Sequence, residues 1–563
     1  MFLWLPGKFS AHSGPRLGAI AGNTSRFTLV ALIAVQVLAF LRTLNGPTLL
    51  LCASGWFLLL QYRRFRGADS GLPRKWIIQV LRLIEEGAWQ DRIRQTLATI
   101  ARTRLRSAGA RIRATSTDPA VLTMIVLGST VITLALLLRF GPALSQSRLG
   151  HPDSYQFVLN ARRLILGESA EVFPSPFVIL SAALAVLSGV DPIHAVRFLG
   201  PMIGFLLPVA AAAYVYRATA NGSAALLAMY ALGTFTFITA HIGGVAWWEV
   251  IASTLNDSFT RQWNAGDWEL GALFGLCAAL AWPSRASNRA DLVNAGCAVV
   301  LVALTAPALL LVVVATAAAR KVGPAFAAAV MATSWIGLSV IGAGSHGWAE
   351  SALATLAVGL ALGLGVASHG FSLCAPTSIR ARFRLATLVA LMVAGVELAP
   401  TGPGGKYLEH EISARKTAEI AASFPRGHWM IVGPVEQLPV VYGLGWYLEL
   451  SAFVNLYAET PGHERTDLDF AIDDVFVFIE KQPFVVVTPA PTAQFSTLAD
   501  PTYLNYRSAA GRASMEYEAS QICETFRSIR HRRSIYYEDS VLKIHRFQRS
   551  SRLSEPLAQH AIR

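Results

Sequence analysis

Long apolar runs separated by short polar stretches recur along the first 400 residues of the chain. A helix needs about 20 apolar residues to cross the roughly 30 Å hydrocarbon core of a bilayer. The pattern therefore predicts a polytopic α-helical membrane protein. Its eleven candidate spans are 27–41, 47–62, 120–139, 193–216, 223–243, 269–283, 292–303, 306–319, 324–343, 351–373 and 385–399.

Two parts of this pattern leave more than one interpretation. The spans on either side of residues 305–307 also fit a single long helix with a kink at Pro307,. The apolar run at 177–190 is short and ends at Asp191-Pro192, which is typical of a helix lying at the membrane interface,.

The pattern changes after residue 400, where charged residues return and apolar runs become shorter. Helical periodicity at 408–423 and 513–530 alternates with segments typical of strands, so we expect a compact α/β domain. The strand predictions are 428–432, 475–480 and 484–488, followed by a hairpin over 533–547 that turns at 538–540.

Composition agrees with a membrane protein and excludes other classes. Of the 563 residues, 53% are hydrophobic and 15% are charged, and the mean hydropathy is +0.45. Soluble domains carry about 25% charged residues, and disordered chains are far less apolar. The five cysteines form no CxxC pair, which disfavours a structural zinc site,. The N-terminus has no signal-peptide pattern, so we expect the first spans to be retained as anchors.

Basic residues predict the orientation of the chain. The net charge is +13, and thirteen Lys and Arg against four Asp and Glu lie between residues 63 and 113. Such a segment is typical of the cytoplasmic face, held against anionic lipid, rather than of a nucleic-acid-binding protein. With eleven spans starting inside, every basic cluster up to Arg384 falls on that face. The loops 140–192 and 244–268 and the whole C-terminal part are then extracytoplasmic.

The chain is therefore predicted to be integral to the cell (inner) membrane and to consist of four segments. They are an N-terminal transmembrane hairpin (1–62), a basic cytoplasmic amphipathic segment (63–118), a transmembrane module (119–399) and an extracytoplasmic α/β domain (400–563). The basic segment either contacts the inner leaflet or binds a cytoplasmic partner.

The first predicted external loop holds the densest set of chemically useful side chains. It begins with His151, Asp153, Tyr155 and Arg162, and its first helix is expected to end at Gly167. The loop continues through Pro174 and Pro176 into the interfacial run and then to Ala195-Val196-Arg197. An Asp at the start of a helix is a common N-cap, and Asp153 fits that interpretation as well.

This order of residues resembles the GT-C glycosyltransferases that use lipid-phosphate sugars, the superfamily of protein mannosyltransferases and lipid A aminoarabinose transferases. Those proteins carry an acidic residue early in the first external loop, then an aromatic residue, a helix ending in Gly, a Pro-containing start of an apolar helix, and Ala-x-Arg. The resemblance extends over about 120–400 in topology and 150–217 in motif, and leaves out residues 1–118.

The resemblance implies a membrane glycosyltransferase that moves a sugar from a polyprenyl-phosphate donor to an extracytoplasmic acceptor glycan, lipid or protein. Asp153 is then the catalytic carboxylate, either as the base that takes the acceptor proton or as a ligand of a divalent cation, Mg²⁺ or Mn²⁺. Direct displacement by the acceptor would invert the anomeric centre. Tyr155, Arg162 and His151 are expected to bind substrate.

The second predicted external loop adds a further set of candidates. Its members are Trp247, Trp248, Glu249, Asp257 and Arg261. Indole rings stack on sugars, carboxylates bind hydroxyls or a cation, and a guanidinium pairs with phosphate, so we expect Glu249 or Asp257 to be a second catalytic acid. The alternative is structural: the tryptophans form an interfacial belt, and Asp257 pairs with Arg261 at i,i+4.

One position departs from the resemblance. The family usually carries a Lys near the lipid phosphate where this chain has Ala306. A substitute cation would have to come from Arg261, Arg162 or His151. Two other functions also stay open: a transporter or flippase of lipid-linked glycans, and a non-catalytic membrane scaffold whose outer domain binds cell-wall components. The glycine-rich stretch 442–447 is interpreted as a structural turn.

Overall fold

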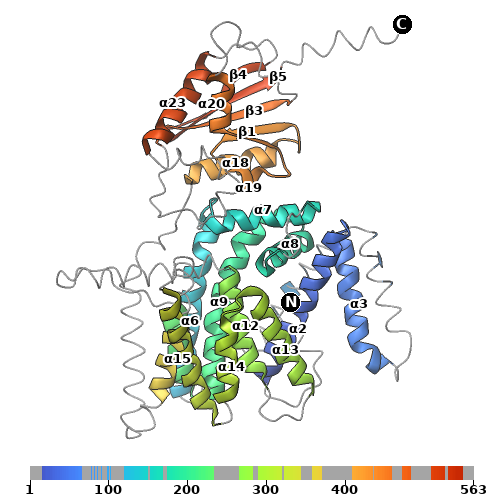
Figure 1. Ribbon diagram of the computed structural model, residues 1–563, viewed down its shortest axis with the longest axis vertical. Coiled ribbons are helices and arrows are strands. Elements are labelled where there is room, and N and C mark those ends of the chain that lie inside the picture. Colours follow the sequence, from blue (N-terminus) through green and yellow to red (C-terminus); the bar gives the residue numbers. More distant parts are fainter. Residues whose placement is uncertain are drawn as a thin grey trace, which may run out of the picture. The chain divides into compact units, whose positions relative to one another are not determined.

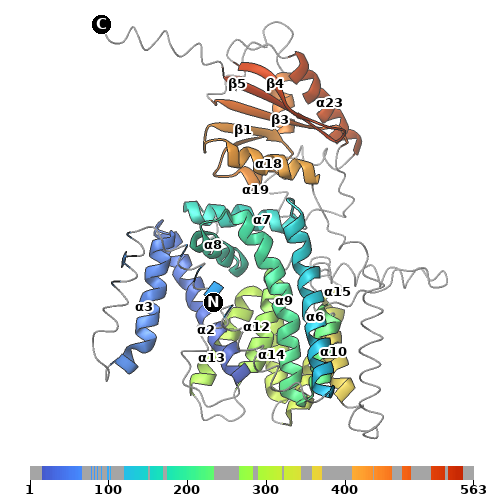
Figure 2. The ribbon, with the colours of Figure 1, turned by 180° about the vertical axis from the view of Figure 1, so that it is seen from behind.

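The computed structural model divides the chain into two compact units, each drawn in Figure 1 and, from behind, in Figure 2. Unit 1 comprises Met1–Ser145 and Gly167–Gly404, and unit 2 comprises Gln146–Leu166 and Gly405–Arg563. The described residues are 16–65, nine single or paired positions between 78 and 102, 119–149, 152–168, 174–233, 266–282, 289–319, 322–343, 358–369, 409–434, 437–458, 472–482, 509–525 and 531–549.

Unit 1 is a bundle of apolar helices. Two helical stretches, Ile20–Phe40 and Pro192–Thr219, are long and apolar enough to cross a membrane, and shorter apolar stretches lie in other helices. The count of eleven spans stays a prediction. The helices are α2 (Arg16–Phe40), α3 (Gly46–Phe65), α6 (Pro119–Ser145), α8 (Pro176–Ser188), α9 (Pro192–Thr219), α10 (Gly222–Gly233), α12 (Asp267–Ala281), α13 (Arg289–Thr305), α14 (Leu309–Ala319) and α15 (Pro324–Ala343), with a further helix over Val358–His369.

The ends of these helices follow local sequence signals. Ser175 caps α8 by accepting a hydrogen bond from the N–H of Val178, and Asp191 caps α9 in the same way at Ile193,. The break between α13 and α14 separates two helices, so the interpretation of one long kinked helix is wrong. Pro307 lies in this break, where it lacks an N–H to continue a helix,.

Helix α12 lies at the centre of unit 1, where it packs against α2, α9, α13 and α14. Small residues allow this close packing. A Cβ on Gly271 would stand 2.6 Å from Cβ of Ala306, and a Cβ on Gly18 of α2 would stand 2.6 Å from the carbonyl oxygen of Leu280. The N-terminal helix α2 is therefore an integral part of the bundle.

Unit 2 is built on a mixed five-stranded sheet in the order β2-β1-β3-β5-β4. Strand β1 pairs in parallel with β2 and β3, whereas β5 is antiparallel to β3 and β4. The predicted hairpin is confirmed, and the predicted strand 484–488 lies outside the described residues. The elements are α18 (Glu411–Ser423), β1 (Trp429–Gly433), α19 (Leu438–Val441), β2 (Trp446–Glu449), α20 (Leu450–Ala458), β3 (Asp474–Glu480), α23 (Ala509–Thr525), β4 (His531–Glu538) and β5 (Leu542–Arg549).

Helices cover both faces of this sheet, which gives unit 2 three layers. Because side chains alternate along a strand, Phe476 and Phe478 of β3 face α18 and α19, where they pack with Ile420,. Val475 and Val477 face the other side, toward α20 and α23. The α/β class predicted for this part of the chain is confirmed by these elements.

Two sets of buried polar groups lie within unit 2. Arg512 donates to Glu480 at 2.9 Å, and the backbone N–H of Glu480 donates to Glu516 at 3.0 Å, with all three residues buried. His545 of β5 is 1% exposed. Burial, with the nearby charges of Lys543 and Arg533, lowers the pKa of His545 to about 4, so its ring is neutral at pH 7,.

Candidate functional site

Helix α7 (Pro152–Leu166) carries Asp153 in its first turn. The helix begins at a proline, which is favourable at the first helical position because its missing N–H would have no partner there. It ends before Gly167, whose φ of +71° is a left-handed conformation that favours glycine,. The helix and its terminal glycine are thus confirmed where the resemblance implies them.

One face of α7 is buried. Tyr155, Val158 and Leu159 are completely buried, and this spacing places them on one side of the helix,. The helix packs against α19. The sequence assigned α7 to the transmembrane module, whereas its contacts group it with the C-terminal part of the chain.

Tyr155 makes the central polar contact of α7. Its hydroxyl donates to Oε1 of Glu409 at 2.5 Å and accepts from the N–H of Leu149 at 3.3 Å. Glu409 is 2% exposed, so its carboxylate needs hydrogen bonds from the protein,. The described contacts of Tyr155 therefore bind the C-terminal part of unit 2 to the segment that carries Asp153.

Glu411 holds the chain immediately before α7. Its carboxylate accepts from the backbone N–H groups of Ser147, at 2.7 Å, and Arg148, at 3.2 Å. The Arg148 side chain returns to the same region, with Nε 3.9 Å from Glu411 and Nη1 donating to the carbonyl of Glu409 at 3.3 Å. Glu409 and Glu411 thus fix the segment at two points.

Arg162 fixes the other end of α7. Its Nη1 donates to the carbonyl oxygen of Tyr442 at 2.6 Å, and the guanidinium of Arg163 lies 5.3 Å from the centre of the Tyr442 ring. The next residue, Gly443, has φ of +75°, and a Cβ there would stand 2.8 Å from Leu166. The glycine-rich stretch is a turn that contacts the C-terminal half of α7 and leads into β2.

Most predicted site residues lie outside the described part of the chain. These are His151, Trp247, Trp248, Glu249, Asp257 and Arg261, together with the side chain of Asp153. Tyr155 and Arg162 are the described ones, and they contact different residues of unit 2. Among the described residues, no group of three or more His, Cys, Asp or Glu could hold a metal ion.

A hydrogen bond joins the two predicted external loops within unit 1. Oδ1 of Asp267, in the first turn of α12, accepts from the N–H of Phe177 in the first turn of α8 at 2.9 Å. Glu269 is 5% exposed and accepts from the N–H of Gly266 at 2.9 Å. Sequence reasoning gave neither carboxylate a role, although an acidic first turn of α12 was a visible signal.

Ala306 is 1% exposed and packs on Gly271 of α12. A lysine at this position would place its stem against a helix that has no room for it. This packing disfavours at position 306 the lysine that the resemblance implies.

No protein-family model and no curated protein matches the chain. Among solved structures, it is similar to the archaeal oligosaccharyltransferase AglB from Archaeoglobus fulgidus, in complex with an inhibitory peptide and a dolichol-phosphate, with 12% identity and a TM-score of 0.25. The match covers 70% of this chain and 46% of that one, so the chain spans less than half the length of AglB. A likeness at this TM-score carries no argument about fold or function.

Proposed function

We propose that the chain is an integral-membrane glycosyltransferase that transfers a sugar from a polyprenyl-phosphate donor to an acceptor on the extracytoplasmic side, with inversion. The proposal rests on the order of elements around Asp153. The apolar helix α6 is followed by α7 with buried Tyr155, the short apolar helix α8 and the long apolar helix α9. That order agrees with the motif by which the sequence resembles the GT-C enzymes.

The hydrogen bond between Asp267 and Phe177 is the single observation that favours an enzyme over a scaffold. It brings the start of α12, at the end of the second predicted loop, to the start of α8, within the first predicted loop. Polar loops that meet at one place on a bundle are suited to a shared substrate, whereas a scaffold has no need of the arrangement.

In the proposed reaction an acceptor hydroxyl attacks the anomeric carbon of the donor, and the bond from that carbon to the phosphate oxygen breaks. The acceptor proton passes to the carboxylate of Asp153 if that residue is the base. Arg261 is proposed to contact the departing phosphate, and the indoles of Trp247 and Trp248 to stack on the sugar. Glu249 or Asp257 supplies the second carboxylate.

The carboxylates of Asp153, Glu249 and Asp257 are the oxygen ligands that Mg²⁺ or Mn²⁺ takes. Their side chains lie outside the described part, so a role for a cation has to be tested in solution.

The test is incubation of membranes containing the protein with labelled polyprenyl-phosphate sugars, with and without a chelator. We expect label to leave the lipid carrier and appear on an acceptor, and loss of transfer on chelation would indicate a metal ligand rather than a base. Label that crosses the bilayer while still attached to the carrier would instead indicate a flippase. Label that stays in place on the carrier would favour a scaffold.

A further inference from the structure

An apolar groove runs along unit 1 between α2, α8, α9 and α12. Among its lining residues, all in the described part of the chain, none is charged and only Thr24 and Thr28 carry hydroxyl groups. On α9 the lining extends from Leu199 to Ala213, a length of about 21 Å at about 1.5 Å per helical residue. In a bilayer, a groove of this kind is filled by a hydrocarbon chain.

A cation lies at one end of this groove. The last lining residues there are Ala213 of α9 and Leu280 of α12, and Arg217 follows one helical turn after Ala213. The guanidinium of Arg217 lies close to this end of the groove. Its Nη1 would stand 2.9 Å from a Cβ on Gly18 of α2, and its Nη2 donates to the carbonyl of Trp282, just after α12, at 3.4 Å.

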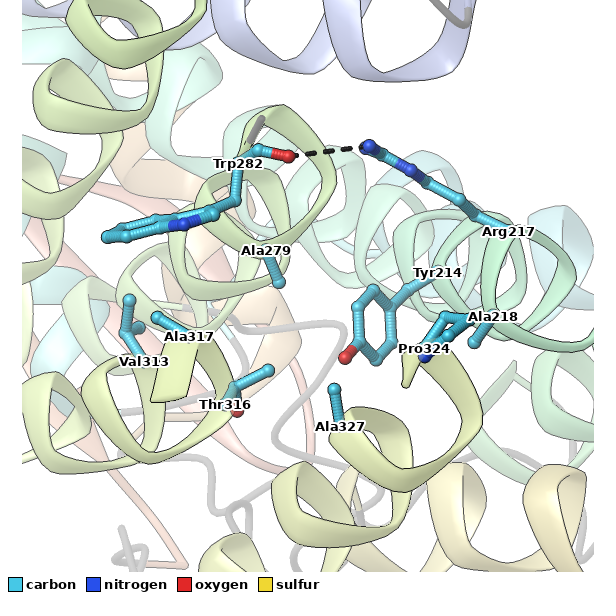
Figure 3. Close-up of a pocket in the computed structure, with 10 residues that line it drawn as sticks. All are labelled: Tyr214, Arg217, Ala218, Ala279, Trp282, Val313, Thr316, Ala317, Pro324 and Ala327. Atoms are coloured by element: carbon cyan, nitrogen blue, oxygen red, sulfur yellow. Dashed lines mark hydrogen bonds between the residues drawn. The ribbon is translucent and has the colours of Figure 1, made fainter. Parts of the chain in front are cut away.

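Arg217 also lines a separate, open pocket between α9, α12, α14 and α15. Figure 3 shows the Tyr214 ring and the Arg217 side chain on one side of this space and Trp282 on the other. Arg217 is the only charged residue among the ten that line it, all of which are described. The first turn of α15, at Pro324, also borders the pocket and adds the partial positive charge of a helix N-terminus,.

We infer that the groove binds a phosphate-bearing lipid, with a chain in the groove and the phosphate at Arg217, next to the end of the groove. A guanidinium complements a phosphate, and the apolar groove whose lining on α9 ends one helical turn before Arg217 complements a chain. A diacyl phospholipid and a polyprenyl phosphate share this chemistry. On the predicted topology Arg217 lies among the cytoplasmic basic clusters, where anionic lipids are concentrated.

The inferred site goes beyond the proposed transfer reaction and does not depend on it. The start of α9, next to α8, and Arg217 are separated by 25 residues of one helix, a length of about 37 Å. A phosphate at Arg217 is therefore far from the end of unit 1 at which the two predicted external loops meet.

The test is thermal unfolding of the purified, delipidated full-length protein with four additions: phosphatidylglycerol, a polyprenyl phosphate, phosphatidylcholine and inorganic phosphate. A ligand of the folded state raises Tm in proportion to its affinity. We expect one or both of the anionic lipids to raise Tm, and to do so clearly more than phosphatidylcholine or inorganic phosphate. The lipid with the larger shift identifies the source of the phosphate. Equal shifts with phosphatidylcholine, or a full shift with inorganic phosphate alone, would overturn the inference.

Three variants assign the shift to this site. Arg217→Gln should weaken the apparent affinity for the anionic lipid at least tenfold, and Arg217→Lys should weaken it less. Because Arg217 also donates to the end of α12, lipid-induced shifts are compared rather than starting Tm values. Ala213→Phe keeps the arginine and fills the groove, so it should abolish the shift with long-chain lipid.

The matched control is Arg532→Gln, which removes an exposed positive charge from β4 of unit 2. It should bind the anionic lipid as the wild type does. Wild-type binding by both Arg217→Gln and Ala213→Phe would contradict the inference.

Discussion

The hydroxyl of Tyr155 donates a hydrogen bond to the carboxylate of Glu409, 254 residues further along the chain. Through this contact, and the two backbone N–H groups held by Glu411, helix α7 is part of the C-terminal unit. The helix that carries the proposed catalytic Asp153 is thus positioned by a domain that the sequence places after the last predicted span.

Replacing Tyr155 by Phe should destabilise unit 2 by about 1–3 kcal/mol, because a buried carboxylate loses a hydrogen bond. Cys523 offers a probe, since its side chain is fully buried in this unit. In a protein whose other four cysteines are replaced, thiol labelling of Cys523 should begin at lower urea in Tyr155→Phe. Tyr517→Phe, at a residue that is 66% exposed, is the control. Equal urea midpoints would contradict the role given to Tyr155.

Replacing Arg512 by Met should cost about 3–5 kcal/mol, because it leaves the carboxylate of Glu480 buried without this cation. Both side chains are almost completely inaccessible, and the ion pair is 2.9 Å long. The double variant Arg512→Met with Glu480→Gln should recover part of the loss, since it removes the buried charge as well. The same Cys523 labelling measures the effect. Additive losses in the double variant would show that the two residues do not interact.

The stability of unit 2 should fall as the pH drops from about 6.5 toward 4, in part because of His545. Its pKa is about 4 in the folded protein and 6.5 when exposed, so the unfolded chain takes up a proton that the folded protein does not. The stabilisation is complete above about pH 6.5 and disappears through the folded pKa, a loss of roughly 3 kcal/mol for this group.

His545→Leu should remove this component of the pH dependence, measured as the urea midpoint of Cys523 labelling between pH 7 and pH 4. His428, which is exposed and 2.8 Å from Asp473, is the control in the form His428→Gln. An unchanged pH profile in His545→Leu would show that another group is responsible.

The sequence predicted those elements of the fold that are determined by neighbouring residues in the chain. The hairpin of β4 and β5, the buried strands β1 and β3 and the end of α7 at Gly167 follow from alternation, apolar runs and turn chemistry. Strand β2 was not predicted, because it has four residues and begins with Trp446, which is 57% exposed. So short a segment has too few positions to show a period of two.

The contacts that shape the candidate site join residues far apart in the chain. Asp267 and Phe177 are 90 residues apart, and Arg162 and Tyr442 are 280 apart. The local sequence of each segment predicts the same helix or turn whether or not the distant residue contacts it. Neither contact could therefore be predicted from the sequence. This is why Tyr155 and Arg162 were predicted to bind substrate, while their described contacts lie within unit 2.

Ala306→Lys, which introduces the lysine that the resemblance implies, should destabilise unit 1 rather than create a phosphate site. Ala306 is buried against Gly271, and a cation placed within a membrane bundle costs about 2.5–3.5 kcal/mol,. Leu304→Lys, at a position that is 55% exposed, is the matched control. Thermal unfolding of the purified variants should show a lower Tm for Ala306→Lys, and equal Tm values would contradict this account of the missing lysine.

The most direct test of the proposed function is the rate of sugar transfer from labelled polyprenyl phosphate by purified Asp153→Asn. The control is Asp191→Asn, because asparagine caps a helix as well as aspartate does and Asp191 caps α9,. Loss of a general base or cation ligand predicts a fall of about a hundredfold or more in Asp153→Asn, with an unchanged Tm and with Asp191→Asn close to wild type. Transfer by Asp153→Asn at the wild-type rate would contradict the assignment of Asp153 as the catalytic carboxylate.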